Sequence, residues 1–158
     1  MESNTNNPQA KTVMVTGATS GIGKATAKYF AKKGYNIIIT GRRADQLEMA
    51  KNKLNTKYGA KVHSLCFDVS DSQACETAIH SLEGGWEIIE ILINNAGGAR
   101  GLEPIQEGKI EDWEYMIDAN VKGLLYMSRM ISPGMVKRGK GHIINICSTA
   151  GHEVYPNG

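Results

Sequence analysis

Ser148 has the residue type and the setting of a group that acts on a substrate oxygen. It follows the apolar run "INIC" at 144–147 and precedes the small-residue turn "TAG". A hydroxyl at the end of a strand is well placed for chemistry on a carbonyl or an alcohol. It needs an acid or a base beside it, however, because a serine is a weak nucleophile and a weak proton donor on its own.

The residues after Ser148 supply no acid or base with a suitable placement. His152 is a nearby imidazole that could in principle act as a general base, but no feature of the sequence orients it toward the serine. Tyr155 is followed by Pro156, and no lysine lies after it. We interpret Tyr155 as a loop aromatic near the mouth of a substrate site.

A glycine-rich segment, "TGATSGIG" at 16–23, joins the first predicted strand to the first predicted helix. Glycines let the backbone turn tightly and approach a pyrophosphate, whose charge is attracted by the free N–H groups at the start of a helix. The hydroxyls of Thr19 and Ser20 can bond a phosphate or cap the helix. An ordinary glycine-rich turn is the alternative, but three glycines directly after strand one favour phosphate binding. The predicted phosphate-binding residues are Gly17, Ala18, Thr19, Ser20, Gly21, Ile22 and Gly23.

The second predicted strand ends in "TGRR", where Arg42 and Arg43 follow Gly41. NAD-binding folds usually place a carboxylate here to accept from the ribose 2′-hydroxyl. That carboxylate is absent, and a guanidinium group can donate twice to a 2′-phosphate. Two solvated arginines at a helix start are the alternative. The missing acid favours NADP(H) over NAD(H) as the cofactor.

The third and fourth predicted strands also end in polar residues. In "FDVSD", Asp68 can accept a hydrogen bond from an adenine amino group, with Val69 beside the ring. The competing interpretation makes Asp68 a turn residue and Ser70 a helix cap. In "NNAGG", Asn95 can lie beside the cofactor or tie neighbouring strands together, and both can hold.

A long helical stretch at 110–137 places Asn120 on an apolar face. The apolar residues that recur with it at helical spacing are Trp113, Ile117, Leu124 and Met127. A polar side chain on a core face costs stability unless it is hydrogen-bonded. We expect Asn120 to be either a helix-kinking water site or a structural tie, and we expect Trp113 and the methionines to lie in the core.

Short apolar strands alternate with longer helical stretches along the chain, which predicts an α/β fold with a Rossmann-type, doubly wound parallel sheet. The ligand crevice of such a sheet lies at the carboxyl ends of its strands. The predicted strands are 12–16, 36–40, 61–67, 89–94 and 142–147, and the predicted helices are 21–33, 44–58, 71–83 and 110–137.

Composition limits the class of protein. The 158 residues are 41% hydrophobic and carry a net charge of +2, which suits one globular domain at 11–158 after a polar, flexible N-terminus at 1–10. The lysines and arginines are spread along the chain, so nucleic acid is not an expected partner, and no apolar run approaches the roughly 20 residues that span a bilayer. Cys66, Cys75 and Cys147 lack metal-ligand spacing. We expect reduced, mostly buried thiols, no metal site and a cytoplasmic protein.

Taken together, "TGATSGIG", "DV" at 68–69, "NNAG", Asn120 and "INICSTAG" resemble the signature segments of the short-chain dehydrogenase/reductase superfamily, over residues 11–158. "TGRR" and the segment at 111–151 resemble its NADP-dependent branch, which oxidises 3-hydroxy acids and serine or threonine. The resemblance implies catalytic roles for Asn120 and Ser148, a small-molecule substrate and a homo-oligomer (dimer or tetramer) in which the helix at 110–137 meets a partner subunit.

The same resemblance implies a tyrosine about thirteen residues after the serine and a lysine about four residues further, where the ammonium lowers the pKa of the phenol. That tyrosine would fall just past Gly158. The apolar edge strand with Ile143, Ile144 and Ile146 also lacks a covering element. We therefore expect an incomplete domain that binds NADP without turnover. The alternatives are a non-catalytic dinucleotide-binding module and a partial product that does not fold stably.

Overall fold

The structure, a computed structural model, describes residues 10–153 and contains one five-stranded parallel sheet. Its order is β3-β2-β1-β4-β5, so the chain winds outward from β1 in both directions. This confirms the doubly wound fold. The predictions for residues 1–9, for Tyr155 and for Pro156 lie outside the described residues. The strands are β1 (Thr12–Val15), β2 (Asn36–Gly41), β3 (Val62–Cys66), β4 (Ile89–Asn94) and β5 (His142–Asn145).

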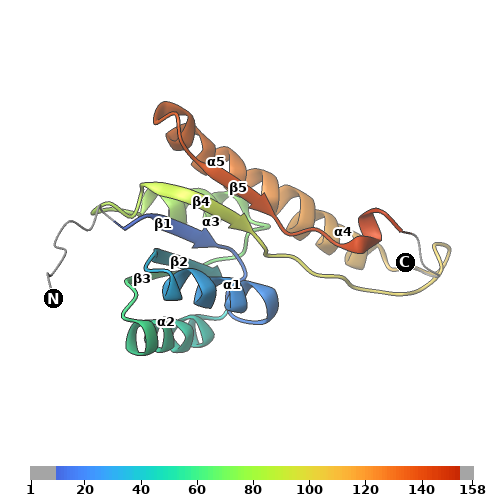
Figure 1. The fold of residues 1–158 in the computed structure, drawn as a ribbon. Coiled ribbons are helices and arrows are strands. Elements are labelled where there is room, and N and C mark those ends of the chain that lie inside the picture. Colours follow the sequence, from blue (N-terminus) through green and yellow to red (C-terminus); the bar gives the residue numbers. More distant parts are fainter. Residues whose placement is uncertain (1–9, 154–158) are drawn as a thin grey trace, which may run out of the picture.

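Helices cover both faces of this sheet (Figure 1). One layer is formed by α1 (Gly21–Lys32) and α2 (Ala44–Tyr58), and the opposite layer by α3 (Ser72–His80) and α5 (Gly123–Lys137). The helix α4 (Ile110–Ile117) precedes α5, and a short turn of 3₁₀-helix, η2 (Thr149–Gly151), follows β5. In the described part of the chain no helix combines the length and the apolarity that a membrane crossing requires.

The strands are apolar on both sides because each side meets a helical layer. In β1, Val13 and Val15 pack with the α1 and α2 side, whereas Met14 packs with the α3 and α5 side. All three side chains are fully buried. The apolar run of β1 therefore has the two-sided burial that was predicted from it, whereas the edge strand β5 contains no fully buried residue.

The predicted helix at 110–137 is interrupted by a π-helical segment, η1 (Asp118–Lys122). The Gly123 N–H donates to the carbonyl of Asp118, five residues earlier, instead of four. The expected burial of this face is wrong at its start, since Ile117 is 52% exposed and Asn120 is also exposed. The reason is that α4 extends past the carboxyl ends of the strands, where no sheet covers it (Figure 1).

The start of α3 differs from the sequence-based interpretation. Asp71, and not Ser70, is the N-cap, because its carboxylate accepts from the N–H groups of Gln73 and Ala74. The Ser70 hydroxyl donates to Asp68 at 2.9 Å and is therefore engaged in the preceding turn.

The cysteines are free thiols, but only one of the three is buried. Burial raises the pKa of the Cys75 thiol to about 11, which keeps it protonated and unreactive. Cys66 and Cys147 are exposed, which corrects the expectation of mostly buried thiols. Cys66 ends β3 and Cys147 follows β5, so both belong to the two edges of the sheet, where one side of the chain lacks a neighbouring strand.

A buried amide attaches the edge strand β5 to the rest of the sheet. The Asn94 Nδ2 donates to Oδ1 of Asn145 on β5 at 2.9 Å and to Oγ of Ser128 on α5 at 3.0 Å. Asn94 is only 6% exposed, so these bonds are shielded from water. One side chain thus joins β4, β5 and α5.

Replacing this amide should destabilise the fold. We expect Asn94→Ala to lower the free energy of unfolding by about 1–3 kcal/mol, because two polar partners lose a shielded donor. Urea denaturation followed by circular dichroism measures it. Asn52→Ala, at an exposed position of α2, should change stability by less than about 0.5 kcal/mol. Equal losses in the two variants would contradict this role for Asn94.

Candidate functional site

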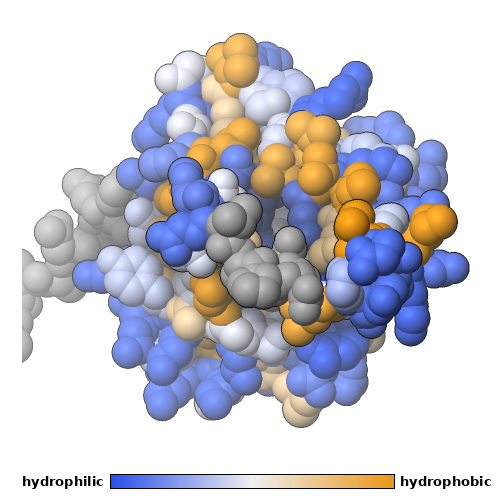
Figure 2. Space-filling view, turned by 90° about the vertical axis from the view of Figure 1, so that its right-hand side faces the viewer, coloured by the Kyte–Doolittle hydropathy of each residue, from blue (hydrophilic) through white to orange (hydrophobic). Residues whose placement is uncertain are grey.

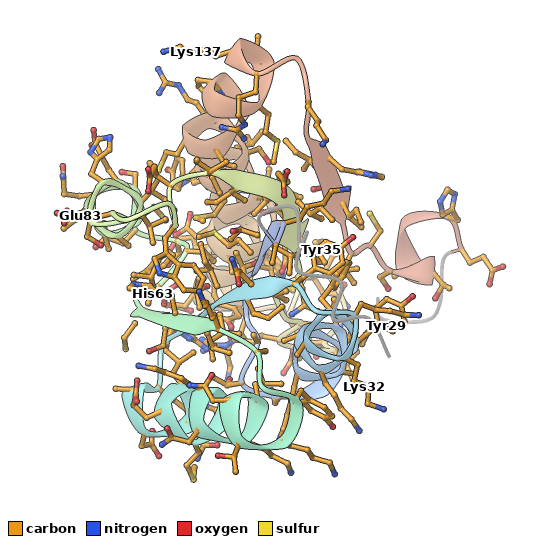
Figure 3. The ribbon with its side chains drawn as sticks, turned by 60° about the vertical axis from the view of Figure 1, so that its left-hand side comes forward. Tyr29, Lys32, Tyr35, His63, Glu83 and Lys137 are labelled. Atoms are coloured by element: carbon orange, nitrogen blue, oxygen red, sulfur yellow. The ribbon has the colours of Figure 1, made fainter. Side chains whose placement is uncertain are left out.

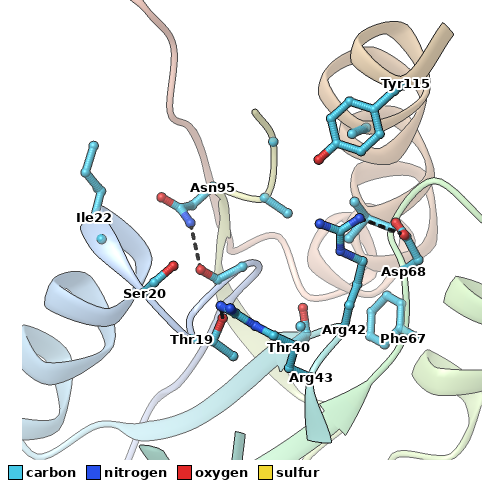
Figure 4. A pocket seen from close by; sticks show the side chains of 17 residues that line it. Thr19, Ser20, Ile22, Thr40, Arg42, Arg43, Phe67, Asp68, Asn95 and Tyr115 are labelled. Carbon is cyan, nitrogen blue, oxygen red and sulfur yellow. Dashed lines mark hydrogen bonds and ion pairs between the residues drawn. The ribbon is translucent and has the colours of Figure 1, made fainter. Parts of the chain in front are cut away.

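A cavity of about 700 Å³ opens at the carboxyl ends of β1, β2, β3 and β4 (Figure 4). This volume lies within the range of small-molecule and cofactor sites. The position is the point where the strand order reverses at β1, which is where ligands bind in open parallel sheets. Ten of the residues predicted from the sequence line it: Gly17, Thr19, Ser20, Gly21, Ile22, Arg42, Arg43, Asp68, Val69 and Asn95.

Thr16 and Asn95 fix the glycine-rich turn to the end of β4. The Thr16 hydroxyl accepts from the N–H groups of Asn95 and Ala96 at 3.0 and 2.9 Å. The Asn95 amide donates in return to the carbonyl of Thr16 at 2.9 Å and to that of Gly17 at 3.2 Å. Asn95 is therefore a tie between strands and also lines the cavity, so the two sequence-based interpretations hold together.

Two glycines of the turn are required by its geometry. Gly17 has φ +64°, a backbone conformation that side chains with a Cβ rarely adopt. A Cβ on Gly23 would collide with the Asn95 amide nitrogen and with the Gly17 carbonyl oxygen. Gly23 and the buried Ala18 do not line the cavity but lie in the turn beneath it, so their predicted part in cofactor binding stays a prediction.

The N-terminus of α1 faces this cavity without a side-chain cap. Ser20 occupies the N-cap position, but its hydroxyl accepts no hydrogen bond from the helix, and the first turn contains no acidic residue. The first N–H groups of a helix need acceptors, and the helix dipole favours a negative charge there. Ser20, Gly21 and Ile22 line the cavity at this point, so this end of α1 can accept a phosphate.

Two arginines at the end of β2 supply positive charge on the opposite side. The Arg43 guanidinium donates to the Thr19 hydroxyl at 3.0 Å, which links the end of β2 to the glycine-rich turn (Figure 4). The Arg42 guanidinium forms an ion pair with Asp68 at 3.4 Å, and its side chain is 56% exposed. Both lie at the cavity with their charge accessible, as an anion-binding role requires.

Asp68 at the end of β3 stays ionised. Partial burial favours the neutral acid, but hydrogen bonds from the Ser70 N–H and hydroxyl and the charge of Arg42 outweigh it, so its pKa lies below the ordinary value. Asp68 is therefore a turn residue, as one of the two sequence-based interpretations proposed, because it accepts hydrogen bonds from the Ser70 N–H and hydroxyl. Its second oxygen faces Arg42, at the wall of the cavity.

Tyr115 is a cavity residue that the sequence did not reveal. It comes from α4 and lies above Arg42, with the guanidinium 5.8 Å from its ring centre (Figure 4). Arg100 stacks on the same ring at 3.5 Å. The pKa of Arg42 is raised, first by Tyr115 and then, against the effect of burial, by Asp68. No sequence signal places Tyr115 here, because the position depends on how far α4 extends past the sheet.

The remaining lining residues that were not predicted are small or apolar and contribute backbone and walls: Thr40, Gly41, Phe67, Ala96, Gly97 and Ala119.

Asn120 and Ser148 lie outside this cavity's lining. The Asn120 amide brackets Gly98, accepting from its N–H and donating to its carbonyl, both at 2.9 Å. Asn120 is therefore a structural tie between η1 and the loop after β4. Ser148 is exposed after β5, and its hydroxyl accepts from the Ala150 N–H at 3.2 Å. In the described part of the chain, neither the His152 nor the Asn120 side chain hydrogen-bonds to the Ser148 hydroxyl.

Residues 11–158 match the short chain dehydrogenase family. The match covers more than half of the chain and includes the glycine-rich turn, the end of β4 and Ser148. The chain belongs to the short-chain dehydrogenase family. This membership agrees with the position of the cavity at the ends of the parallel strands.

Curated dehydrogenases are similar to this chain in sequence. The NADP-dependent 3-hydroxy acid dehydrogenase of Salmonella typhi is 48% identical over 146 residues, 92% of this chain and 57% of that protein. Serine 3-dehydrogenase of Rhizobium radiobacter is 42% identical over 147 residues, 93% of this chain and 57% of that protein. The chain thus spans little more than half the length of these curated relatives.

Solved structures agree with this relationship. The crystal structure of serine dehydrogenase from Escherichia coli has a TM-score of 0.87 and 46% identity, over 92% of this chain and 66% of that one. The closed form of serine dehydrogenase complexed with NADP⁺ has a TM-score of 0.86 and 46% identity, over 93% and 58% of the two chains.

The Thr16 hydroxyl offers a direct test of the turn's support. Thr16→Val keeps the shape of the side chain but removes the acceptor of two N–H groups, at a residue that is 2% exposed. We expect the free energy of unfolding to fall by about 2–4 kcal/mol, measured by urea denaturation. Thr12→Val is the control, because Thr12 is also buried, in the strand that Thr16 follows, and its hydroxyl bonds none of residues 10–153. If both variants lose the same stability, the hydroxyl does not support the turn.

Proposed function

We propose that this chain holds NADP(H) for a dehydrogenase that acts on small 3-hydroxy acids or related secondary alcohols. The observation that carries the proposal is one cavity with an uncapped helix N-terminus on one side and two arginines on the other. The first suits a pyrophosphate and the second suits a further phosphate on the adenosine ribose. The NADP-dependent relatives support the same choice of cofactor.

Each side of the cavity has its own part in binding. The N–H groups of Ser20 to Ile22 hold the pyrophosphate, and Arg42 and Arg43 hold the 2′-phosphate. The Arg43 guanidinium already donates to the Thr19 hydroxyl, and it binds the 2′-phosphate either beside this hydrogen bond or in exchange for it. Asp68 accepts from the adenine amino group, because its lowered pKa keeps it an acceptor at neutral pH. Val69 packs near the adenine ring, and Asn95 keeps the turn in its binding shape.

When bound, NADP(H) supplies or accepts the hydride, and the chain's own residues act around the substrate oxygen. Ser148, which follows β5, donates a hydrogen bond to that oxygen. Asn120 supports proton transfer by fixing the backbone of Gly98, beside the cavity residue Gly97. The substrate class follows the relatives, which are named for 3-hydroxy acids and for serine.

A cytoplasmic location is part of the same proposal. The three cysteines are free, and two of them are exposed. Thiols remain reduced in the cytosol, whereas oxidising compartments favour their pairing.

The choice of NADP(H) can be tested by fluorescence titration. We expect saturable binding of NADPH, and we expect Arg42→Ala with Arg43→Ala to raise its Kd about 10- to 100-fold, because the 2′-phosphate loses its charge-assisted bonds. Binding of NADH should change by less than about twofold. The control is Arg129→Ala on α5, which removes an exposed arginine far from the end of β2 in sequence. A well-folded chain that ignores NADPH, or equal losses for both cofactors, would refute the proposal.

We also propose that α4 and α5 form the contact with a second copy of the chain. Four apolar side chains spaced by seven, four and four residues are exposed there: Ile110 (62%), Ile117 (52%), Val121 (53%) and Leu125 (56%). This spacing places them on one face of the helical segment formed by α4, η1 and α5. Figure 2 looks toward the end of the molecule that contains α4, where apolar side chains lie at the surface among charged ones. An apolar stripe of this kind is typical of an interface.

Size-exclusion chromatography with light scattering tests this contact. We expect the chain to be a dimer or tetramer, and we expect Val121→Asp to shift it to monomer, because an interface cannot hold an unpaired carboxylate without a large cost. Met49→Asp adds the same charge at a methionine of α2 that is 56% exposed, and it should leave the assembly unchanged. The contact is wrong if the parent chain is monomeric or if both variants dissociate alike.

A further inference from the structure

Lysines that are scattered in the sequence converge on a groove between α1 and α2. The groove has a volume of about 300 Å³, and its floor contains the buried side chains of Ala27 and Leu54. It lies in the helical layer behind the glycine-rich turn, and Gly21 borders both the groove and the cofactor cavity. Four exposed lysines form its walls: Lys24 and Lys28 from α1, and Lys53 and Lys57 from α2.

The positive charge of this groove is not balanced by acidic residues in the described part of the chain. No acidic residue lines the groove, and none of its four lysines forms an ion pair within residues 10–153. Helix α1 contains no acidic residue at all. In α2 the nearer acid, Glu48, is engaged by the Ser64 hydroxyl at 2.7 Å and by Lys51 at 3.5 Å.

The spacing of these lysines costs stability. Lys24 and Lys28 are four residues apart, as are Lys53 and Lys57, and like charges at this helical spacing repel each other. Lys32 continues the α1 row by another four residues, and Figure 3 shows it at the side of the molecule where α1 and α2 lie. A multiply charged anion between the two helices would reverse this repulsion.

We propose that the groove binds a small organic polyphosphate. The phosphates lie between the two lysine rows, because an ammonium is a compact point charge with three donors that suits a phosphate. The organic part of the ligand rests on the apolar floor and against Tyr58, a half-buried residue that also lines the groove. A volume of about 300 Å³ suits a small ligand and is too small for a macromolecular partner's folded element.

This site is separate from the proposed cofactor site. The cofactor cavity uses the N-terminus of α1 and two arginines, whereas the groove uses the sides of α1 and α2. The two share Gly21 alone. An anion in the groove therefore needs neither Arg42 nor Arg43, and this separates the two sites experimentally.

Isothermal titration calorimetry with ATP in magnesium-free buffer tests the proposal, with NADPH present in excess. We expect one ATP per chain, and we expect Lys53→Glu with Lys57→Glu to weaken its binding by about tenfold or more. Lys11→Glu with Lys137→Glu is the matched control, since it makes the same change in net charge at exposed positions outside the groove. Figure 3 places Lys137 at the opposite end of the molecule from Lys32. This control should alter the Kd by less than about twofold.

Several results would overturn the site, and circular dichroism with a thermal melt first establishes that each variant is folded. Equal weakening in the two double variants would indicate a response to net charge alone. Loss of ATP binding in Arg42→Ala with Arg43→Ala, but not in the lysine variant, would assign ATP to the cofactor cavity. Inorganic tripolyphosphate should bind more weakly than ATP, and equal binding would exclude a contribution from the apolar floor. Because the groove lysines do not line the cofactor cavity, their effect on ATP binding tests the groove whether or not NADPH occupies that cavity.

Discussion

The exchange of hydrogen bonds between Thr16 and Asn95 is the constraint on which the site depends. It joins the carboxyl ends of β1 and β4, the two strands between which the sheet's winding reverses. Because the Asn95 amide also holds the Gly17 carbonyl, the turn that follows β1 has one shape. That shape directs the N-terminus of α1 at the cavity and leaves room for only a hydrogen at Gly23. Strand pairing, turn geometry and anion binding therefore share one buried set of donors and acceptors.

Features encoded by short segments could be predicted from the sequence. The five strands and the first two helices begin and end within one or two residues of their predicted bounds, because each apolar run is followed directly by glycine or a polar residue. The glycine-rich turn and the arginines after β2 were found for the same reason. Parallel strands then bring their carboxyl ends together, which places Thr19, Arg43 and Asp68 around one cavity with no further information.

Features that depend on where an element lies could not be predicted. Helical spacing grouped Asn120 with apolar residues, but spacing does not show whether a sheet lies opposite, and here α4 extends past the sheet. The same extension brings Tyr115 to Arg42. Cys66 and Cys147 are exposed because β3 and β5 are the edge strands of the sheet. The order of the strands across the sheet cannot be deduced from the sequence of either strand. The π-helical turn at Asp118 is likewise absent from the apolar pattern.

The near-neutral net charge of the chain conceals a concentration of positive charge in one segment. Residues 21–58 contain nine lysines and arginines but two acids, whereas the rest of the chain contains nine and fourteen. This segment is α1, β2 and α2, which lie together on one side of the molecule (Figure 1). A concentrated field of one sign raises the local concentration of oppositely charged ligands and speeds their association, most strongly at low ionic strength. The cofactor cavity at the end of this unit and the groove between its helices both lie in that field. The same basic segment can therefore attract two phosphate-bearing ligands while the arginines and the lysines hold them at different places.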